Sequence, residues 1–491
     1  MINQNFSVAL RYTAVYITLN SNSYFISSLN SRQNYPKKGK KFMSLTFKGG
    51  VRPDDHKYTA NYQIQLIPAP EYVAIPLTQH VGVMCHPVVK VGDKVLRGQL
   101  IGEIPGGLGC PVHSGISGTV RGIEEFTTEN GGSSYRIIIE NDRLNTISPT
   151  VKPFGKKLSE ASFEEIVSVI RNAGITGMGG TAFPTHARIT AARGKVDRII
   201  INCMETEPFT CSTHRLVMEN AQEIINGAKV IMMALGVREA WCAVGEDRRD
   251  ELKELSSVIE KSGSSELVTV KRVTPKYPAD MEKQLVYALT GIAVPYGKSS
   301  IDAGCVVFSA DTLVAVYEAF AKGMPLCARV VTVDGDCISE PANFLVPIGT
   351  PVSHLINCCD GLCRQVKKIV MGGAMQGKAA WDTETPVTKN TKSVLVFSEF
   401  FDRETKREPV CLRCSRCVDA CPMGLMPLKI AEAVKRRDFH TAEKLSAEIC
   451  TECGCCTYVC PGGVPVSQLV SVARTSITEK RRKAAKTADK K

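Results

Sequence analysis

Two copies of one cysteine pattern lie near the carboxyl end of the chain. The first runs C-x2-C-x2-C-x3-C-P from Cys411 to Pro422, and the second repeats this spacing from Cys450 to Pro461. Proteins that bind [4Fe–4S] clusters use this spacing, and in a two-cluster domain the fourth cysteine of each copy binds the cluster of the other copy. The pattern therefore predicts an α-helical, ferredoxin-type domain over residues 400–479 that holds two [4Fe–4S] clusters.

The crossed arrangement divides the motif cysteines between two clusters. We expect the first cluster to be held by Cys411, Cys414, Cys417 and Cys460, and the second by Cys450, Cys453, Cys456 and Cys421. Structural zinc is the alternative for a single C-x2-C-x2-C, but two full copies that end in Cys-Pro argue against it. The extra Cys455 is interpreted as a small residue that fills space. Another group, Cys358, Cys359 and Cys363, lacks a matching set of ligands and is interpreted as buried or incidental thiols.

The length and composition are those of a multidomain globular protein. A chain of 491 residues corresponds to about two to five domains, and its 44% hydrophobic content argues against a long disordered protein. No stretch reaches the roughly 18 consecutive apolar residues that a membrane span needs, so an integral membrane protein is excluded. Nine of the 20 cysteines fall between Cys411 and Cys460, and because no secretory signal is recognisable, these clustered cysteines are interpreted as metal ligands rather than disulfides.

The net charge of +12 is confined to the two ends of the chain. Residues 1–42 carry six basic residues and no acidic one, and residues 480–491 carry seven basic residues and one acidic residue, so residues 43–479 are neutral. A neutral body offers no basic face, and nucleic acid is therefore not an expected partner. We interpret residues 480–491 as a solvated, disordered basic tail, and the alternative is a tail that binds phosphate or anionic lipid. Residues 1–42 are expected to be a disordered or non-native extension, with Met43 as the true start.

Residues 43–150 are predicted to form a small antiparallel β domain. Short apolar runs over residues 75–120 are separated by Gly-Asp, Arg-Gly and Ser-Gly turns. The pattern resembles the barrel-sandwich hybrid of biotinyl and lipoyl carrier domains, but the hairpin that would present the carrier lysine reads Val-His-Ser-Gly at residues 112–115. We therefore expect no swinging arm, and we interpret His113 and His86 as packed or surface residues rather than catalysts.

Alternating strands and helices predict an α/β domain with a mainly parallel sheet over residues 155–325. The helices are expected at Phe163–Gly174 and His214–Gly236, and the strands at Val196–Asn202 and Glu239–Asp247.

A second β-rich module is predicted over residues 326–398. Short apolar runs there are separated by a Gly-Asp turn and a Pro-Ile-Gly-Thr-Pro turn. A loop, MGGAMQG, follows, and a further strand is expected near Ser393–Phe397.

Two motifs in the α/β region are candidates for a cofactor site. The Gly-rich loop from Gly177 to Thr185 can bring its backbone close to a ligand and offer amides to phosphate. The segment Asn202–Phe209 follows a buried strand, and α/β folds place their sites at this end of a strand. Its carboxylates, Glu205 and Glu207, can accept hydrogen bonds from ribose hydroxyls or a carboxamide. The alternatives are an ordinary Gly-rich turn and a pair of solvent-exposed glutamates.

The motifs occur in a fixed order along the chain: the sandwich segment, GMGGTAFPT, NCMETEPF, KYPADMEKQLVYALTG, GDCISEP and the double cysteine pattern. In this order they resemble the RnfC component of the Rnf electron-transport complex over about residues 43–475. The central part is also similar to the NADH-binding flavoprotein subunit of respiratory complex I. The resemblance implies non-covalent FMN, NAD(H), a β-grasp (SLBB) module within residues 326–398, and two [4Fe–4S] clusters.

The resemblance also implies which residues line the cofactor site, and it assigns none of them as an acid or base catalyst. The sequence departs from the family pattern at Thr181-Ala182 in place of Ala-Gly, at Arg188 in place of lysine, and at Ser309 in place of asparagine. The matching positions are Gly177, Gly179, Gly180 and Phe183 in the flavin loop, Arg188 after it, Asn202, Glu205 and Glu207 beside flavin and nicotinamide, Lys276 and Glu282 in the motif KYP-x3-EKQL, and Thr312 at a helix start.

The function that the resemblance implies is electron exchange between NAD(H) and ferredoxin in an Rnf-type ion-translocating complex. A flavin suits such a chain because a hydride carries two electrons whereas a cubane cluster carries one. The expected partners are the other subunits of that complex, with ferredoxin reached indirectly, and the expected place is the cytoplasmic face of the membrane. Two alternatives are a soluble flavoprotein that feeds proline reductase or cobalamin reductase, and a pure iron–sulfur relay without nucleotide chemistry.

Overall fold

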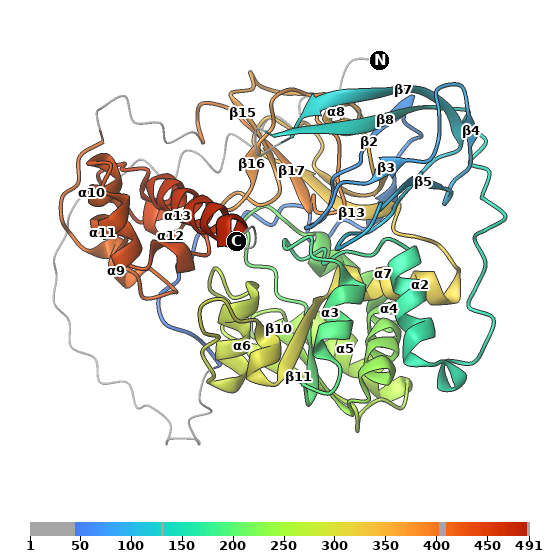
Figure 1. The fold of residues 1–491 in the computed structure, drawn as a ribbon, viewed down its shortest axis with the longest axis horizontal. Helices are drawn as coiled ribbons and strands as arrows, with labels where there is room; N and C mark the ends of the chain where they lie inside the picture. The colour runs from blue at the N-terminus through green and yellow to red at the C-terminus, as the bar shows by residue number, and fades with distance from the viewer. Residues whose placement is uncertain (1–44, 129–131, 402–408, 489–491) are drawn as a thin grey trace, which may run out of the picture. The chain divides into compact units, whose positions relative to one another are not determined.

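The computed structural model describes residues 45–128, 132–401 and 409–488 (Figure 1). The expectations for residues 1–42 and for a start at Met43 lie outside these ranges. Within them the strands form four sheets, of six, four, four and three strands, and a helical region follows at the carboxyl end. None of the helices in the described ranges is long and apolar enough to cross a bilayer.

Two small sheets form the antiparallel β domain that the sequence predicts. Every pairing within them is antiparallel. Side chains of Val73, Ile75 and Ile139 are fully buried between the sheets because alternate residues of a strand point to the same face. One sheet has the order β2 (Tyr72–Pro76), β8 (Ser133–Asn141), β7 (Gly118–Thr127) and β4 (Lys94–Val95), and the other has the order β3 (His86–Pro87), β5 (Leu100–Glu103) and β6 (Val112–His113).

His113 and His86 are packed and exposed, respectively, as the sequence predicts. His113 is buried, and burial, aided by the nearby Lys389, lowers its pKa to about 3, so its ring is neutral. His86 lies on the exposed strand β3.

The α/β domain contains a four-stranded parallel sheet, which confirms the predicted topology. Its strands are ordered β11 (Val268–Val273), β10 (Glu239–Gly245), β9 (Arg198–Asn202) and β12 (Cys305–Ser309), and each pairing is parallel. Its helices and short 3-10 turns are η2 (Leu158–Glu160), α2 (Phe163–Asn172), α3 (Thr185–Ala192), α4 (Ser212–Leu235), α5 (Arg249–Lys261), α6 (Glu282–Thr290), η3 (Ser300–Ala303) and α7 (Ala310–Ala321).

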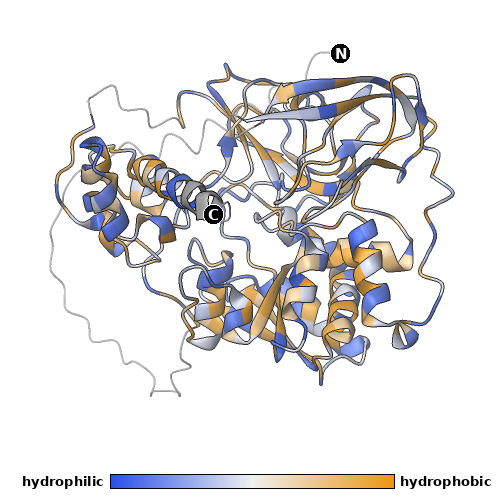
Figure 2. Cartoon of the chain, in the orientation of Figure 1, coloured by the Kyte–Doolittle hydropathy of each residue, from blue (hydrophilic) through white to orange (hydrophobic). Residues whose placement is uncertain are grey.

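Both faces of this sheet are covered. Ile199 and Ile201 of β9 pack in the core that contains α4 and α7, whereas Ile200 packs in the core that contains α6. Figure 2 shows the strands as mostly hydrophobic, which is typical of a parallel sheet buried on both sides.

Local signals set the ends of the two predicted helices. A capping box, in which Ser162 accepts from the Glu165 amide and Glu165 accepts from the Ser162 amide, starts α2. Gly236, with φ of 68°, ends α4 in the left-handed conformation that glycine adopts at little cost.

The six-stranded sheet takes its edge strand from a distant part of the chain. Strand β17 lies where the sequence predicts it, but β1 pairs in parallel with β14, with Ile64 opposite Asn343. The order is β1 (Ile64–Leu66), β14 (Ala342–Pro347), β13 (Ala328–Asp334), β17 (Ser393–Phe397), β15 (Lys368–Met371) and β16 (Lys378–Ala379), with helix α8 (Val352–Asn357) between β14 and β15 in the chain.

Residues 409–488 form the helical domain that carries both cysteine patterns. Ile430 of α10 and Val470 of α13 are almost fully buried and lie in its core, so these helices hold the domain together. The elements are α9 (Arg416–Asp419), α10 (Pro427–Lys435), α11 (Phe439–Lys444), η4 (Ala447–Ile449), α12 (Cys455–Tyr458) and α13 (Val466–Ala488).

Residues 480–488, which include most of the carboxyl-terminal basic residues, are helical. The expectation of a disordered tail is therefore wrong for these residues. Helix α13 continues through them. Arg481 donates to Glu443 of α11 at 3.0 Å and to Glu448 of η4 at 3.1 Å, so these ion pairs tie this turn of the helix to two neighbouring elements.

An extended segment of residues 45–59, which we call the strap, joins the α/β domain to the helical domain. Phe47 is buried in the core that contains α6, which anchors the strap. Its main-chain contacts are the bridges of Leu45 to Val273 and of Val51 to Tyr277, and the hydrogen bond from the Gly50 amide to Ala420 O at 2.9 Å.

Candidate electron-transfer site

The Gly-rich loop is closed on itself and tied to α7. The Gly177 amide donates to Phe183 O at 2.8 Å, and the Ala182 amide donates to Gly177 O at 3.0 Å. The Met178 amide donates to Thr312 Oγ1 at 3.0 Å. Two motifs that the sequence predicts to lie together, the flavin loop and the start of α7, are therefore in contact.

Unpaired amides in this loop fit an anionic group. The amides of Gly179, Gly180 and Thr181 donate to no other group within the described part of the chain. Gly180 has φ of +113°, which side-chain-bearing residues rarely adopt, and the space at its Cβ position is open. At Gly179 an added Cβ would lie 3.2 Å from the side chain of Ser309. Successive unpaired amides are the donors with which backbone loops bind phosphate, so this loop fits a flavin nucleotide.

Arg188 and Glu282 form an ion pair. The Arg188 guanidinium lies 2.8 Å from Glu282 and also donates to Val307 O at 3.2 Å. Burial acts to raise the pKa of Glu282, but Arg188 and hydrogen bonds from Ser300 outweigh it and lower the pKa. The pair joins α3 to the start of α6, so two predicted site residues fix each other's position.

Asn202 fixes the backbone at the end of β9. Its amide nitrogen donates to Asp280 O at 2.8 Å, and its side-chain oxygen accepts from the Met204 amide at 3.1 Å. Asp280 also accepts a hydrogen bond from the Thr206 hydroxyl. The KYP motif and the segment after β9 are therefore joined by side-chain hydrogen bonds.

Glu205 caps the start of α4. One carboxylate oxygen accepts from the Thr213 amide at 2.7 Å, and the other accepts from the His214 amide at 3.2 Å. Cys211, at the N-cap position, makes no side-chain cap of its own. A carboxylate at a helix N-terminus satisfies amides that lack partners and is favoured by the helix dipole.

Replacing Glu205 with alanine is expected to lower the free energy of unfolding by about 1–2 kcal/mol, because the first amides of α4 lose their acceptor. Anaerobic thermal unfolding of the full chain measures this loss. Glu223→Ala, in the same helix but away from its start, is the matched control and is expected to change little. Equal stabilities for the two variants would contradict the capping role.

Glu207 is a buried carboxyl group with one oxygen left unpaired. Its Oε2 accepts from the Met375 amide at 2.8 Å, and its Oε1 accepts no hydrogen bond within the described residues. An added Cβ at Gly373 would lie 2.1 Å from the Glu207 side chain, so the backbone at Gly373 covers it closely. Burial, followed by the charge of Asp280, raises the pKa of Glu207 from 4.5 to about 8. A buried polar atom without a partner fits a hydrogen-bonding ligand at this position.

Lys276 contacts the strap rather than the Gly-rich loop. Its ammonium group donates to Phe47 O and, at 2.9 Å, to Gly49 O, and it lies 4.3 Å from the centroid of the Phe47 ring. Its predicted place in the nucleotide site stays a prediction.

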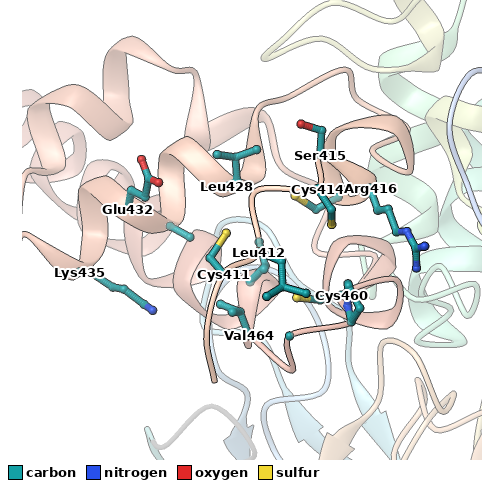
Figure 3. Close-up of a pocket in the computed structure, with 15 residues that line it drawn as sticks. Cys411, Leu412, Cys414, Ser415, Arg416, Leu428, Glu432, Lys435, Cys460 and Val464 are labelled. Atoms are coloured by element: carbon teal, nitrogen blue, oxygen red, sulfur yellow. The ribbon is translucent and has the colours of Figure 1, made fainter. Parts of the chain in front are cut away.

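One set of predicted cluster ligands surrounds a cavity of about 50 Å³. Figure 3 shows the labelled Cys411, Cys414 and Cys460 with their sulfurs turned toward this common space. Cys411 and Cys414 are exposed, whereas Cys417 is buried. The side chains that line the cavity include Cys411, Cys414, Cys417, Cys460, Leu412, Leu428 and Val464. Several thiols around one mainly apolar space fit an iron–sulfur cluster.

The remaining four motif cysteines also lie near one another. Burial raises the pKa of Cys456 to about 12, and the thiols of Cys453, Cys450 and Cys421 act in the same direction. In the first set, burial, then Cys411 and Cys460, raise the pKa of Cys417. Cys421 thus lies near Cys450, Cys453 and Cys456, and Cys460 lines the cavity with Cys411, Cys414 and Cys417, but the crossed assignment of the ligands stays a prediction.

A single loop contacts both Glu207 and the second cysteine set. The Met375 amide binds Glu207, and an added Cβ at Gly454 would lie 2.9 Å from Met375 O. From the α/β domain, the Tyr277 hydroxyl donates to Cys453 O at 2.6 Å. The second cysteine set is therefore packed directly against the side of the α/β domain that carries the predicted nucleotide residues.

The cysteines outside the two ligand sets are mostly buried, and the thiols of Cys203 and Cys242 lie 3.6 Å apart. Cys455 is fully buried beside Tyr277, in agreement with its interpretation as a space-filling residue. The Cys359 thiol is buried, whereas the Cys363 thiol is exposed and lies near backbone oxygens. Within the described residues, no three His, Cys, Asp or Glu side chains are grouped as the ligands of a single metal ion.

Sequence reasoning missed Lys57, Asp280 and Met375. Lys57 donates to the backbone of the Glu205–Thr210 segment, and the other two bind Asn202 and Glu207. Asp280 lies inside the KYP motif and Met375 inside the Gly-rich MGGAMQG loop, so both motifs signal a special backbone. No local pattern marks Lys57.

Three family models match separate parts of the chain: the RnfC barrel sandwich hybrid domain over residues 45–144, the Nuo51 FMN-binding domain over residues 170–318, and the 4Fe-4S dicluster domain over residues 410–464. The chain is 36% identical over 440 residues to the RnfC component of the Na(+)-translocating ferredoxin:NAD(+) oxidoreductase complex of Acetobacterium woodii, which covers 89% of this chain and 98% of that protein. The chain belongs to the RnfC family. The family membership predicted from the sequence is thereby confirmed.

Other RnfC relatives are equally similar. The chain is 36% identical over 387 residues to the corresponding component of the proton-translocating ferredoxin:NAD(+) oxidoreductase complex of Clostridium ljungdahlii, covering 78% of this chain and 83% of that protein. It is also 36% identical over 445 residues to the corresponding component of the ion-translocating oxidoreductase complex of Rhodobacter capsulatus, covering 89% of this chain and 84% of that protein. As an RnfC protein, the chain combines an FMN-binding domain with a [4Fe–4S] dicluster domain.

Proposed function

We propose that this RnfC protein exchanges electrons between NAD(H) and ferredoxin within an Rnf-type ion-translocating complex at the membrane. The observation that carries the proposal is the packing of the second cysteine set against Tyr277 of the α/β domain and against the Met375 loop, which itself binds Glu207. A soluble reductase partner remains the alternative from sequence, but the relatives named above favour the membrane complex. The protein is proposed to bind peripherally at the cytoplasmic face, with ferredoxin reached through the other subunits.

The cofactors that we assign are non-covalent FMN, NAD(H) and two [4Fe–4S] clusters. FMN held here would supply the chemistry that joins a two-electron hydride donor to one-electron clusters. The amides of Gly179 and Gly180 would hold the flavin phosphate, with Gly177 and Phe183 closing the loop. The cluster ligands are the two cysteine sets described above.

The residues of the chain orient the nucleotide and keep water away from it. Glu207 offers the unpaired Oε1 to a hydroxyl or carboxamide, while Asn202 and Asp280 hold the backbone on which Glu207 is carried. Arg188, Glu282 and Thr312 fix the elements around the Gly-rich loop. No side chain in this arrangement needs to transfer a proton to the nucleotide.

The packing supports one order of transfer. The set Cys421, Cys450, Cys453 and Cys456 lies against Tyr277 of the α/β domain, so a cluster held there would be the inner one. The other set includes the exposed Cys411 and Cys414, so a cluster held there would lie nearer to the surface where a partner can approach.

The domain boundaries are proposed as residues 43–150 for the sandwich, 155–325 for the FMN/NADH domain and 400–479 for the dicluster domain. Residues 326–398 are proposed to form a β-grasp (SLBB) module with its linker. Its core around Val331, Phe344 and Val394 supports a separate module, to which residues 64–66 add the edge strand β1.

Anaerobic purification of the full chain tests the proposal. We expect about eight iron atoms per chain, four for each cubane, together with FMN and oxidation of NADH. Glu207→Ala is expected to lose NADH oxidation but to keep its iron and FMN. In the described hydrogen bonds, the Glu207 side chain contacts neither a cysteine ligand nor the Gly-rich loop. Protein that binds no flavin and does not oxidise NADH would instead support the iron–sulfur relay, and zinc in place of iron would reject both.

A further inference from the structure

Three consecutive strap residues, Asp55, His56 and Lys57, hold the segment after β9 from outside the α/β domain. Lys57 Nζ donates to Glu207 O at 2.7 Å and also to Thr210 O. The Lys57 side chain is only 7% exposed. Its ammonium group is therefore committed to this segment rather than to solvent.

The segment that Lys57 holds is in an uncommon conformation. Phe209 has φ of 66°, which is rare for a bulky residue, and its side chain is buried. Such a backbone persists when several contacts fix it at once. The Phe209 amide donates to Asp55 O at 3.0 Å, and the His56 ring stacks on the Phe209 ring at a centroid distance of 4.6 Å and an interplanar angle of 12°.

The charge of Lys57 also lies beside the two glutamates of the segment. Its ammonium group is 4.0 Å from Glu205 Oε2, and Glu205 caps α4 with the same carboxylate. Lys57 also acts to lower the pKa of Glu207, against burial and Asp280, which raise it. One buried cation thus binds the backbone between the two glutamates and also lies beside the Glu205 carboxylate.

We infer that Lys57 is a positioning residue of the nucleotide site, which holds the Glu205–Thr210 segment in place so that Glu205 and Glu207 keep their positions at the end of β9. The inference rests on the proposed NADH-oxidising function, whereas the contacts of Lys57 from which it is argued are independent of that function. Lys57 touches neither the Gly-rich loop nor a cysteine ligand in the hydrogen bonds that the structure describes. It acts on the nucleotide only through the segment.

The test compares Lys57→Met with Lys57→Arg and with Lys48→Met in the anaerobically purified full chain. Lys57→Met keeps the length of the side chain and removes its charge and donors. Lys48 is an exposed lysine of the same strap, so Lys48→Met is the matched control. Hydrogen exchange of peptides that cover residues 205–214 reports the segment directly, and the KM and kcat for NADH report the site.

In Lys57→Met, charge-assisted hydrogen bonds to the segment are lost, so the amides of residues 205–214 are expected to exchange faster. The KM for NADH is expected to rise about tenfold. The kcat and the iron and flavin contents are expected to change little. Lys57→Arg is expected to have a KM close to that of the wild type, and Lys48→Met is expected to match the wild type in both measurements. A lysine with only a structural role would lower the unfolding temperature of Lys57→Met but leave the KM of the folded protein unchanged.

Unchanged exchange and unchanged KM in Lys57→Met would overturn the inference. If Lys57→Met does not accumulate as folded protein, Lys57→Gln, which keeps a donor without the charge, gives the same comparison with the same two outcomes. If the wild type does not oxidise NADH, the proposed function fails. The exchange measurement still decides whether Lys57 holds the segment, because it needs no nucleotide.

Discussion

In the assembled complex, replacing Cys453 with alanine is expected to abolish electron transfer between NAD(H) and ferredoxin while NADH oxidation by a small artificial acceptor continues. The iron content is expected to fall from about eight to about four atoms per chain, because one of the two cubanes loses a ligand. Flavin content is expected to be unchanged, since the Gly-rich loop makes no contact with Cys453 in the described hydrogen bonds. Iron and flavin analysis with both assays, all without oxygen, measures these outcomes.

The matched control is Cys455→Ala, two residues along the chain. Cys455 is fully buried next to Cys453 but belongs to neither ligand set. Its replacement removes one sulfur from a packed site, which costs about 1 kcal/mol of stability, and leaves the iron content near eight atoms per chain. If Cys455→Ala lost iron and Cys453→Ala kept it, the ligand assignment would be wrong.

The second large effect concerns the pH dependence of stability through Glu207. In the folded chain its pKa is raised from 4.5 to about 8. Between these values the folded protein keeps the proton and the unfolded chain loses it, so rising pH favours the unfolded chain and stability falls. The fall is about 1.4 kcal/mol per pH unit and totals about 5 kcal/mol by pH 8, above which it levels off.

The variant Glu207→Gln is expected to lack this fall, because glutamine is close in shape and cannot ionise. Thermal unfolding of wild type and variant from pH 5 to pH 8 measures the difference, in which other titrating groups such as Asp334 cancel. The stability of the variant relative to the wild type is therefore expected to increase as pH rises. Glu260→Gln, at the exposed end of α5, serves as the control and is expected to follow the wild type. If the stabilities of Glu207→Gln and the wild type changed with pH in the same way, Glu207 would be ionised throughout this range.

Much of the fold follows from local patterns in the sequence. The apolar run before Asn202 predicts a buried strand, and the structure has β9 at Arg198–Asn202 within an all-parallel sheet. The apolar periodicity of residues 214–236 predicts the helix that the structure begins at Ser212. These patterns succeed because strand and helix periodicity is set by near neighbours in the chain.

The candidate site is only partly predictable in this way. The Gly-rich loop and the segment after β9 are recognisable, since glycines and strand ends mark them locally. Three contacts are not recognisable, because each joins separate segments of the chain. Glu205 caps α4, Met375 binds Glu207, and Lys276 contacts the strap. A glutamate in a motif can serve a ligand or a helix, and only its neighbours in space decide which.

The sequence by itself determined the two cysteine patterns, the order of the modules and the family, because ligand spacing and strand or helix periodicity are properties of short segments. The tertiary structure alone decided which cysteine set faces the α/β domain, where β1 pairs and which lysine holds the Glu205–Thr210 segment. Lys57 and Glu207 are 150 residues apart, and Tyr277 and Cys453 are 176 residues apart. Contacts at such separations depend on how whole domains pack, and a local pattern carries no record of that packing.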